Sequence, residues 1–163
     1  MKKINPHLST VCLGNRISKD SLDTVASMLM DEYEKKNGKI LGYAANQLSW
    51  DLPIFLIKWH DKTVSIIHDP EIMWSWGNKK SNEGCESLGP NRYIVTRPRL
   101  CKVRYYEYDL EDKVSVQRTR LLFSQDSRRF MHEYDHLCGT TIKDKGELYR
   151  WNSIYLGLKK QHT

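Results

Sequence analysis

The sequence contains no long apolar run, and its first residues do not have the pattern of an export signal. Its longest apolar stretches, such as residues 54–57, are far too short to cross a bilayer. Residues 1–6 (MKKINP) lead into polar sequence rather than into the apolar core of a signal peptide. We therefore expect no membrane partner and a cytoplasmic location, which would be the host-cell cytoplasm for a viral protein, or an organelle if a presequence is missing.

Closely spaced cysteine pairs are absent as well. The four cysteines include no Cys-x-x-Cys pair, which argues against both a disulfide framework and a zinc ribbon. We expect most of them to be buried as small apolar side chains. They are Cys12, Cys85, Cys101 and Cys138.

Low-complexity tracts and internal repeats are also missing, so nothing divides the chain. With 163 residues, of which 39% are hydrophobic and 28% charged, we expect one domain over residues 1–163 with a substantial core. The net charge of +6 comes from scattered basic groups. A solvated basic surface is the ordinary interpretation, attraction to the ribosome surface is the sharper alternative, and no DNA partner is expected.

The most informative stretch is residues 130–139 (FMHEYDHLCG), which contains His-Glu-x-x-His in a pattern typical of a helix. Positions four apart share a helix face, so His132 and His136 can bind one metal ion while Glu133 remains unbound beside it. Gly139 stands where a helix C-cap glycine belongs. A catalytic site of this kind also needs a third protein ligand and a free position for water.

The best third ligand is Cys85, in a turn-rich segment at residues 82–90 (NEGCESLGP). A thiolate on a glycine-flanked loop can reach a metal, and a Cys/His/His set leaves the fourth position to water. A structural role is the alternative for a lone cysteine. The other histidines belong to no motif and are expected at the surface; they are His7, His60, His68 and His162.

The remaining patterns favour an α+β fold. Apolar residues with a 3.6-residue period predict a helix that starts at Ser18 or Asp20 and ends at residues 37–38. Ser124 or Asp126 is expected to cap the helix of the metal motif. Alternating patterns between the helices predict strands at residues 54–59, 64–67, 71–76, 92–95, 101–108 and 114–122. We expect a mostly antiparallel sheet packed around a central metal-binding helix, with an N-terminal helix.

Three segments, in this order, resemble the signature motifs of peptide deformylases, G-φ-G-φ-A-A-x-Q, E-G-C-φ-S and Q-H-E-x-D-H, where φ is an apolar residue. Here they read ILGYAANQ at residues 40–47, EGCES at 83–87 and MHEYDH at 131–136. Taken alone, the small residues of the first segment indicate close packing or a peptide that pairs with a strand edge. Three ordered motifs are far more specific than one.

The resemblance implies a metal centre and a reaction. Cys85, His132 and His136 would hold one divalent ion, typically Fe²⁺ in this family, with Zn²⁺, Ni²⁺ or Co²⁺ able to substitute. Glu133 would be the general acid and base. Family members of this kind remove the formyl group from the N-terminal formylmethionine of newly made peptides, so N-formylated nascent peptides are the expected partners.

The resemblance also implies residues that handle the substrate. The side chain of Gln47 and the backbone N–H of Glu86 would bind the developing oxyanion. Leu41 and Gly42 would pair with the substrate backbone. The ion pair expected to hold the cysteine loop is Glu83 with Arg97.

Four positions depart from the family pattern. Ile40 replaces a glycine, Glu86 stands where bacterial members usually have an aliphatic residue, Met131 replaces a glutamine, and Arg129 replaces a small or aliphatic residue. Arg129 lies one helical turn before Glu133. Either its stem packs in the cavity wall while the guanidinium reaches water or a carboxylate, or its charge enters the substrate pocket and lowers selectivity for methionine. The short tail after residue 139 predicts that a long C-terminal helix is absent.

Two other functions compete with deformylation. A His-Glu-x-x-His metallopeptidase would cut internal peptide bonds, but such enzymes more often recruit Glu or His as the third ligand. A catalytically degenerate relative would bind nascent chains or ribosomes without turnover, although every expected ligand and Glu133 are intact. Turnover of a formyl-Met peptide separates the three functions.

Overall fold

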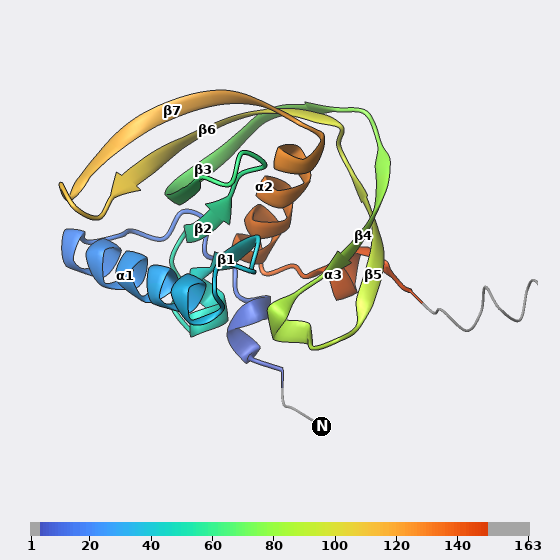
Figure 1. The fold of residues 1–163 in the computed structure, drawn as a ribbon, viewed down its shortest axis with the longest axis horizontal. Coiled ribbons are helices and arrows are strands. Elements are labelled where there is room, and N and C mark those ends of the chain that lie inside the picture. The colour runs from blue at the N-terminus through green and yellow to red at the C-terminus, as the bar shows by residue number, and fades with distance from the viewer. Residues whose placement is uncertain (1–3, 150–163) are drawn as a thin grey trace, which may run out of the picture.

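The computed structural model describes residues 4–149, which form an α+β fold (Figure 1). The strands are β1 (Gly42–Ala44), β2 (Ile54–Lys58), β3 (Val64–Trp76), β4 (Lys79–Gly84), β5 (Arg92–Arg97), β6 (Leu100–Asp109), β7 (Val114–Phe123) and β8 (Glu147–Leu148). The α-helices are α1 (Lys19–Lys35), α2 (Ser124–Leu137) and α3 (Ile142–Lys145), and the 3-10 helices are η1 (Pro6–Ser9), η2 (Ala45–Leu48) and η3 (Glu86–Leu88).

The strands form two antiparallel sheets. The larger sheet has the order β1-β2-β3-β6-β7 and the smaller one the order β4-β5-β8. Figure 1 shows α2 in the middle of the molecule, with the larger sheet on one side and β4 and β5 on the other. The expectation of a mostly antiparallel sheet around a central helix is therefore confirmed.

The two faces of strand β2 pack against the two long helices, α1 and α2. Its apolar run IFLI has no polar face, and alternate side chains enter different clusters. Phe55 and Ile57 pack in the cluster that contains Phe130 of α2, while Ile54 and Leu56 pack in the cluster formed with α1. A strand with both faces buried needs such a continuous apolar run, and it anchors both helices to one sheet.

The helix boundaries agree with the sequence at α1 and differ at α2. Ser18 caps α1 by accepting a hydrogen bond from the Ser21 N–H, and the chain leaves the helix through two positive-φ residues, 37 and 38, as predicted. The predicted caps of α2 were wrong, because the helix begins at Ser124 directly after β7 and its N-cap is Phe123. Gly139, with φ +71°, follows the C-cap of α2 as predicted.

One predicted break between strands was wrong, and one six-residue strand was not predicted. Residues 64–67 and 71–76 belong to one strand, β3, because the Asp69-Pro70 step is a bulge with a register shift and not a turn. A bulge lets a strand accommodate a proline that has no N–H to donate. Strand β4 was missed, because its sequence KKSNEG lacks an apolar alternation.

The remaining expectations have mixed outcomes. Cys12, Cys85 and Cys101 are buried, as expected for most of the cysteines. His68 is buried rather than exposed, because its ring stacks on Tyr106 and its nitrogens contact Asp69 and Ser115 at 2.8 Å each. His162 and the predicted lack of a long C-terminal helix lie outside the described residues. Within residues 4–149, no helix is long and apolar enough to cross a membrane.

Candidate functional site

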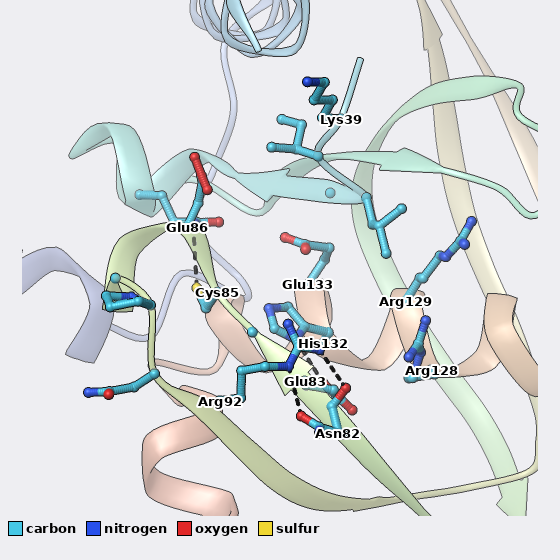
Figure 2. A pocket seen from close by; sticks show the side chains of 18 residues that line it. Lys39, Asn82, Glu83, Cys85, Glu86, Arg92, Arg128, Arg129, His132 and Glu133 are labelled. Carbon is cyan, nitrogen blue, oxygen red and sulfur yellow. Dashed lines mark hydrogen bonds and ion pairs between the residues drawn. The ribbon is translucent and has the colours of Figure 1, made fainter. Parts of the chain in front are cut away.

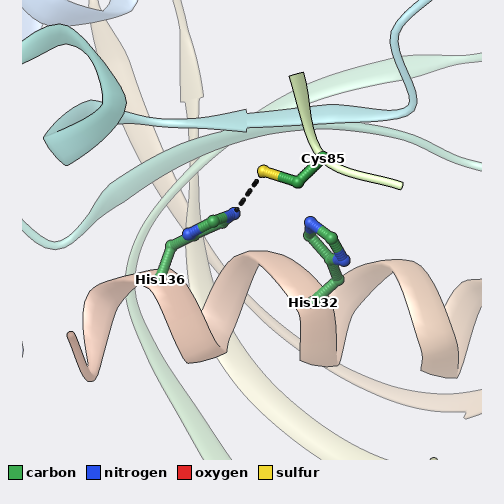
Figure 3. A group of neighbouring side chains, drawn as sticks. All are labelled: Cys85, His132 and His136. Atoms are coloured by element: carbon green, nitrogen blue, oxygen red, sulfur yellow. Dashed lines mark hydrogen bonds between the residues drawn. The ribbon is translucent and has the colours of Figure 1, made fainter. Parts of the chain in front are cut away.

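The two motif histidines and the loop cysteine come together. His132 and His136 project from α2 with ring centroids 5.1 Å apart, and Cys85 approaches them from the end of β4 (Figure 3). One ligand atom from each of the three residues lies within 4.8 Å of the others, and the Cys85 Sγ is 3.5 Å from the His136 Nε2. A thiol and two imidazoles this close to one another form a set of ligand atoms that fits a divalent transition metal such as zinc or iron.

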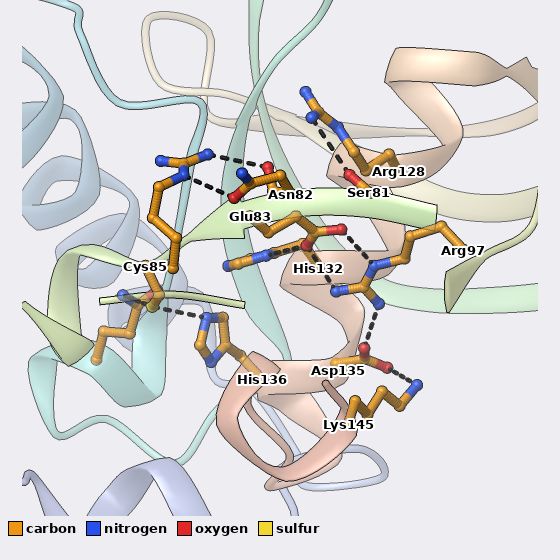
Figure 4. Close-up of polar contacts among 12 residues, drawn as sticks. Ser81, Asn82, Glu83, Cys85, Arg97, Arg128, His132, Asp135, His136 and Lys145 are labelled. Carbon is orange, nitrogen blue, oxygen red and sulfur yellow. Dashed lines mark hydrogen bonds and ion pairs between the residues drawn. The ribbon is translucent and has the colours of Figure 1, made fainter. Parts of the chain in front are cut away.

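A buried chain of charges supports this ligand set (Figure 4). Glu83 accepts a hydrogen bond from the His132 Nδ1 at 2.9 Å and a bidentate pair of bonds from Arg97 at 2.8 and 2.9 Å. Arg97 also pairs with Asp135 at 2.5 Å, and Asp135 pairs with Lys145 at 2.8 Å. Burial alone would raise the pKa of Glu83, but the bonds from His132 and Arg97 lower it to about 2. Because Glu83 holds the Nδ1 of His132, the Nε2 of that ring faces the site.

Glu133 lies beside the three candidate ligands, and one of its carboxylate oxygens lacks a hydrogen-bond partner among the described residues. Its side chain is buried, and its Oε2 has no hydrogen-bond partner among the described residues. Burial is the main cause that raises its pKa to about 7. Gly42 of β1 passes so close that a Cβ at this position would overlap the Glu133 side chain. The glycine is therefore what allows the carboxyl group to stand against the edge of β1.

Gln47 points its amide towards the cysteine loop. Its Oε1 accepts a hydrogen bond from the Ala44 N–H at 2.8 Å, which fixes the amide so that Nε2 faces Ser87 at 2.9 Å and the Cys85 Sγ at 3.9 Å. Glu86 is the first residue of η3, where backbone N–H groups lack partners within the helix. Gln47 and the Glu86 N–H thus offer two donors close to the candidate metal position.

One cavity of about 370 Å³ connects these groups (Figure 2). The residues predicted to handle substrate all line it, namely Leu41, Gly42, Gln47, Glu86 and Arg129, together with Cys85, His132 and Glu133. Strand β1 is an edge strand of the larger sheet, so one of its sides is not paired with another strand of the described chain. Such an edge can bind an extended peptide.

Several lining residues were not singled out from the sequence. Arg92 and Arg128 line the cavity, and Asp135 and Lys145 extend the charge chain behind it. Asp135 is the aspartate of the third motif, so the motif could have indicated it. No local pattern indicates where the side chains of Arg92 and Arg128 point.

Arg129 lies in the cavity wall, and its two predicted roles, wall residue or determinant of methionine selectivity, stay predictions. It lines the cavity, but its Nη1 donates to the Lys58 carbonyl at 2.9 Å and its Nη2 donates to the Gln125 Oε1 at 3.2 Å. The guanidinium thus binds two neutral acceptors of the wall, and within residues 4–149 it forms no ion pair with a carboxylate.

Comparison with known proteins gives consistent results. The family model described as Polypeptide deformylase matches residues 2–150. A peptide deformylase of Cytophaga hutchinsonii is 31% identical over 137 residues, covering 78% of this chain and 71% of that protein. One from Lachnoclostridium phytofermentans is 31% identical over 136 residues, covering 81% and 79%. The crystal structure of the Thermotoga maritima peptide deformylase has a similar fold, with a TM-score of 0.76 at 21% identity over 88% of this chain and 92% of that one.

Proposed function

This chain belongs to the polypeptide deformylase family of metal-dependent amide hydrolases, and we propose that it removes the formyl group from N-terminal formylmethionine of newly made peptides. The observation that carries the proposal is the convergence of Cys85, His132 and His136 next to a cavity that Cys85, His132 and Glu133 line. The substrates are then N-formylated nascent peptides in the cytoplasm. The basic surface would favour contact with the ribosome.

Three residues would hold the metal ion. We assign Cys85, His132 and His136 as its ligands and Fe²⁺ as the physiological ion, with Zn²⁺, Ni²⁺ or Co²⁺ able to substitute. When bound, such an ion lowers the pKa of water from about 15.7 towards 7 and polarises a carbonyl oxygen. Glu83 would orient His132 by accepting its Nδ1–H, which would leave the Nε2 available as the metal ligand.

Glu133 would transfer the proton. It lies next to His132 in the sequence and faces the edge of β1 at Gly42, where the formyl group would lie. Its carboxylate would accept a proton from the attacking water and return it to the amine nitrogen as the formyl C–N bond breaks. A step of this kind contributes roughly 10²- to 10⁴-fold in rate.

The oxyanion and the peptide backbone would have separate partners. The Gln47 Nε2 and the Glu86 N–H would donate to the oxygen that becomes negative, and a donor of this type contributes about 3 kcal/mol. Leu41 and Gly42, at the outer edge of the larger sheet as residues 4–149 form it, would pair with the substrate backbone.

Formate release from formyl-Met-Ala-Ser after anaerobic loading with Fe²⁺, Ni²⁺ or Zn²⁺ tests the function. The proposal predicts that the metal-loaded protein releases formate and leaves the Met-Ala bond of the peptide intact. Cleavage at an internal bond would indicate a metallopeptidase. A protein that holds one metal ion per chain and binds the peptide, but releases no formate, would be a catalytically degenerate binding protein.

A further inference from the structure

The active-site cavity is lined by an excess of cations. Arg128 and Arg129 lie on its α2 wall, Arg92 projects from β5, and Lys39 lies just before β1. Figure 2 shows Arg128 and Arg129 close to each other on one side of the cavity. Helix geometry places Arg128 one turn before His132 and Arg129 one turn before Glu133, so both side chains approach the position of the substrate.

Two acidic residues of the cavity wall do not balance these cations, because each already has a basic partner outside the lining. Glu83 is bound by Arg97, and Glu86 pairs with Lys36 at 2.7 Å. Among residues 4–149, none of the four lining cations forms an ion pair with a carboxylate. Glu133 is the remaining acid of the lining. The cavity therefore carries a positive excess beside the candidate metal position.

Within residues 4–149, the two arginines of α2 are bound only to neutral groups. Arg129 donates to a backbone carbonyl and to Gln125, and Arg128 makes one long hydrogen bond of 3.5 Å to the Ser81 Oγ. A guanidinium has five N–H donors, so Arg128 retains most of its donors for a ligand. Burial and the charge of Arg128 lower the pKa of Arg129, and the more weakly acting carboxylate of Asp126 does not offset them.

We propose that the cavity selects formylated peptides that carry an acidic side chain within their first three residues, with Arg128 as the main determinant. This inference rests on the proposed deformylase function. A carboxylate in the cavity would bind the free donors of Arg128 in a charge-assisted geometry and would offset the repulsion between neighbouring cations. RNA phosphates could also bind clustered cations, but these cations line a cavity beside the reacting groups, which suits a side chain of the substrate better than the backbone of an RNA.

The test compares C-terminally amidated formyl-Met tripeptides, so that a side chain supplies the only carboxylate. Aspartate, alanine or lysine is placed at the second or the third position, which locates the contact. At one of the two positions, we expect kcat/KM at low salt to be about tenfold higher for the peptide with aspartate than for the peptide with lysine at the same position. The difference should arise mainly from KM. The ratio should fall towards one as the ionic strength rises to about 0.5 M.

Three variants make the test specific. Arg128→Gln should remove most of the aspartate preference, Arg129→Gln should remove less because its donors are already bound, and Lys19→Gln, on α1 away from the cavity, should leave the preference unchanged. Binding of N-acetyl-Met-Asp-Ala-amide and N-acetyl-Met-Lys-Ala-amide, measured by calorimetry, gives a second readout without turnover. Equal kcat/KM and equal binding for the acidic and basic peptides would overturn the inference. An absence of turnover with every formyl peptide would instead contradict the proposed function.

Discussion

Glu133 is the residue whose replacement best separates catalysis from structure. Its carboxylate is buried beside the candidate ligands, and its Oε2 has no partner within residues 4–149. We expect Glu133→Ala to retain bound metal and fold but to lose about 10²- to 10⁴-fold in kcat, because proton transfer is lost. Glu133→Gln keeps the shape of the side chain, and its kcat should fall by a similar factor. Near-normal kcat in either variant would contradict the proton-transfer role, and loss of the metal would make Glu133 structural.

Gly42 matters through the space that it leaves for Glu133. A methyl group at this position would overlap the Glu133 side chain, so Gly42→Ala should displace the carboxyl group. We expect a folded variant with kcat lowered at least about tenfold, in line with the effect of small displacements of reacting groups.

A double-mutant cycle tests the cause of this loss. If Gly42→Ala acts through Glu133, adding it to Glu133→Ala should change kcat little further. Additive losses in the double variant would mean that Gly42 acts on the substrate directly.

At the scale of elements, the chain of charges joins β4 and β5 to α2. Arg97 is 3% exposed and binds both Glu83 of β4 and Asp135 of α2. Replacing Arg97 by Gln leaves two buried carboxylates without their main partner, which is expected to cost about 3–5 kcal/mol in the free energy of unfolding. The metal affinity should also fall by about 10- to 100-fold, because Glu83 then orients His132 less firmly.

Chemical denaturation and metal titration measure these two effects. The matched control is Arg104→Gln, because the exposed pair of Arg104 with Glu71 contributes at most about 1 kcal/mol. Equal losses in the two variants would show that the buried chain of charges has no special role.

The elements differ in how far the sequence predicts them. Helix α1 and strand β2 follow from their apolar periods, because burial of one stripe or of both faces dictates the pattern. Strand β4 has no such pattern, since much of its length is exposed and it is held by pairing with β5. The bulge at residues 69–70 looks like a turn in sequence, because a turn and a bulge use the same residue types.

At the scale of the whole molecule, the sequence indicates which residues form the site but not how charged side chains pair across the fold. The three motifs name the cysteine, both histidines and Glu133, and the structure brings them together. Lys36 and Glu86 are 50 positions apart, and no local pattern connects them. The directions of Arg92, Arg128 and Arg129 depend on acceptors from other elements, which only the folded chain supplies.

The proposed activity depends on one ion, held by a ligand from the end of β4 and two ligands from α2. The most direct test measures formate release from formyl-Met-Ala-Ser against bound Fe²⁺ in the wild type and in Cys85→Ser, under anaerobic conditions. We expect release by the wild type to rise in proportion to bound metal up to one ion per chain, and Cys85→Ser to lose metal and turnover together. Full metal occupancy and full turnover in Cys85→Ser would contradict the ligand assignment, and a metal-saturated wild type that releases no formate would contradict the proposed deformylase activity.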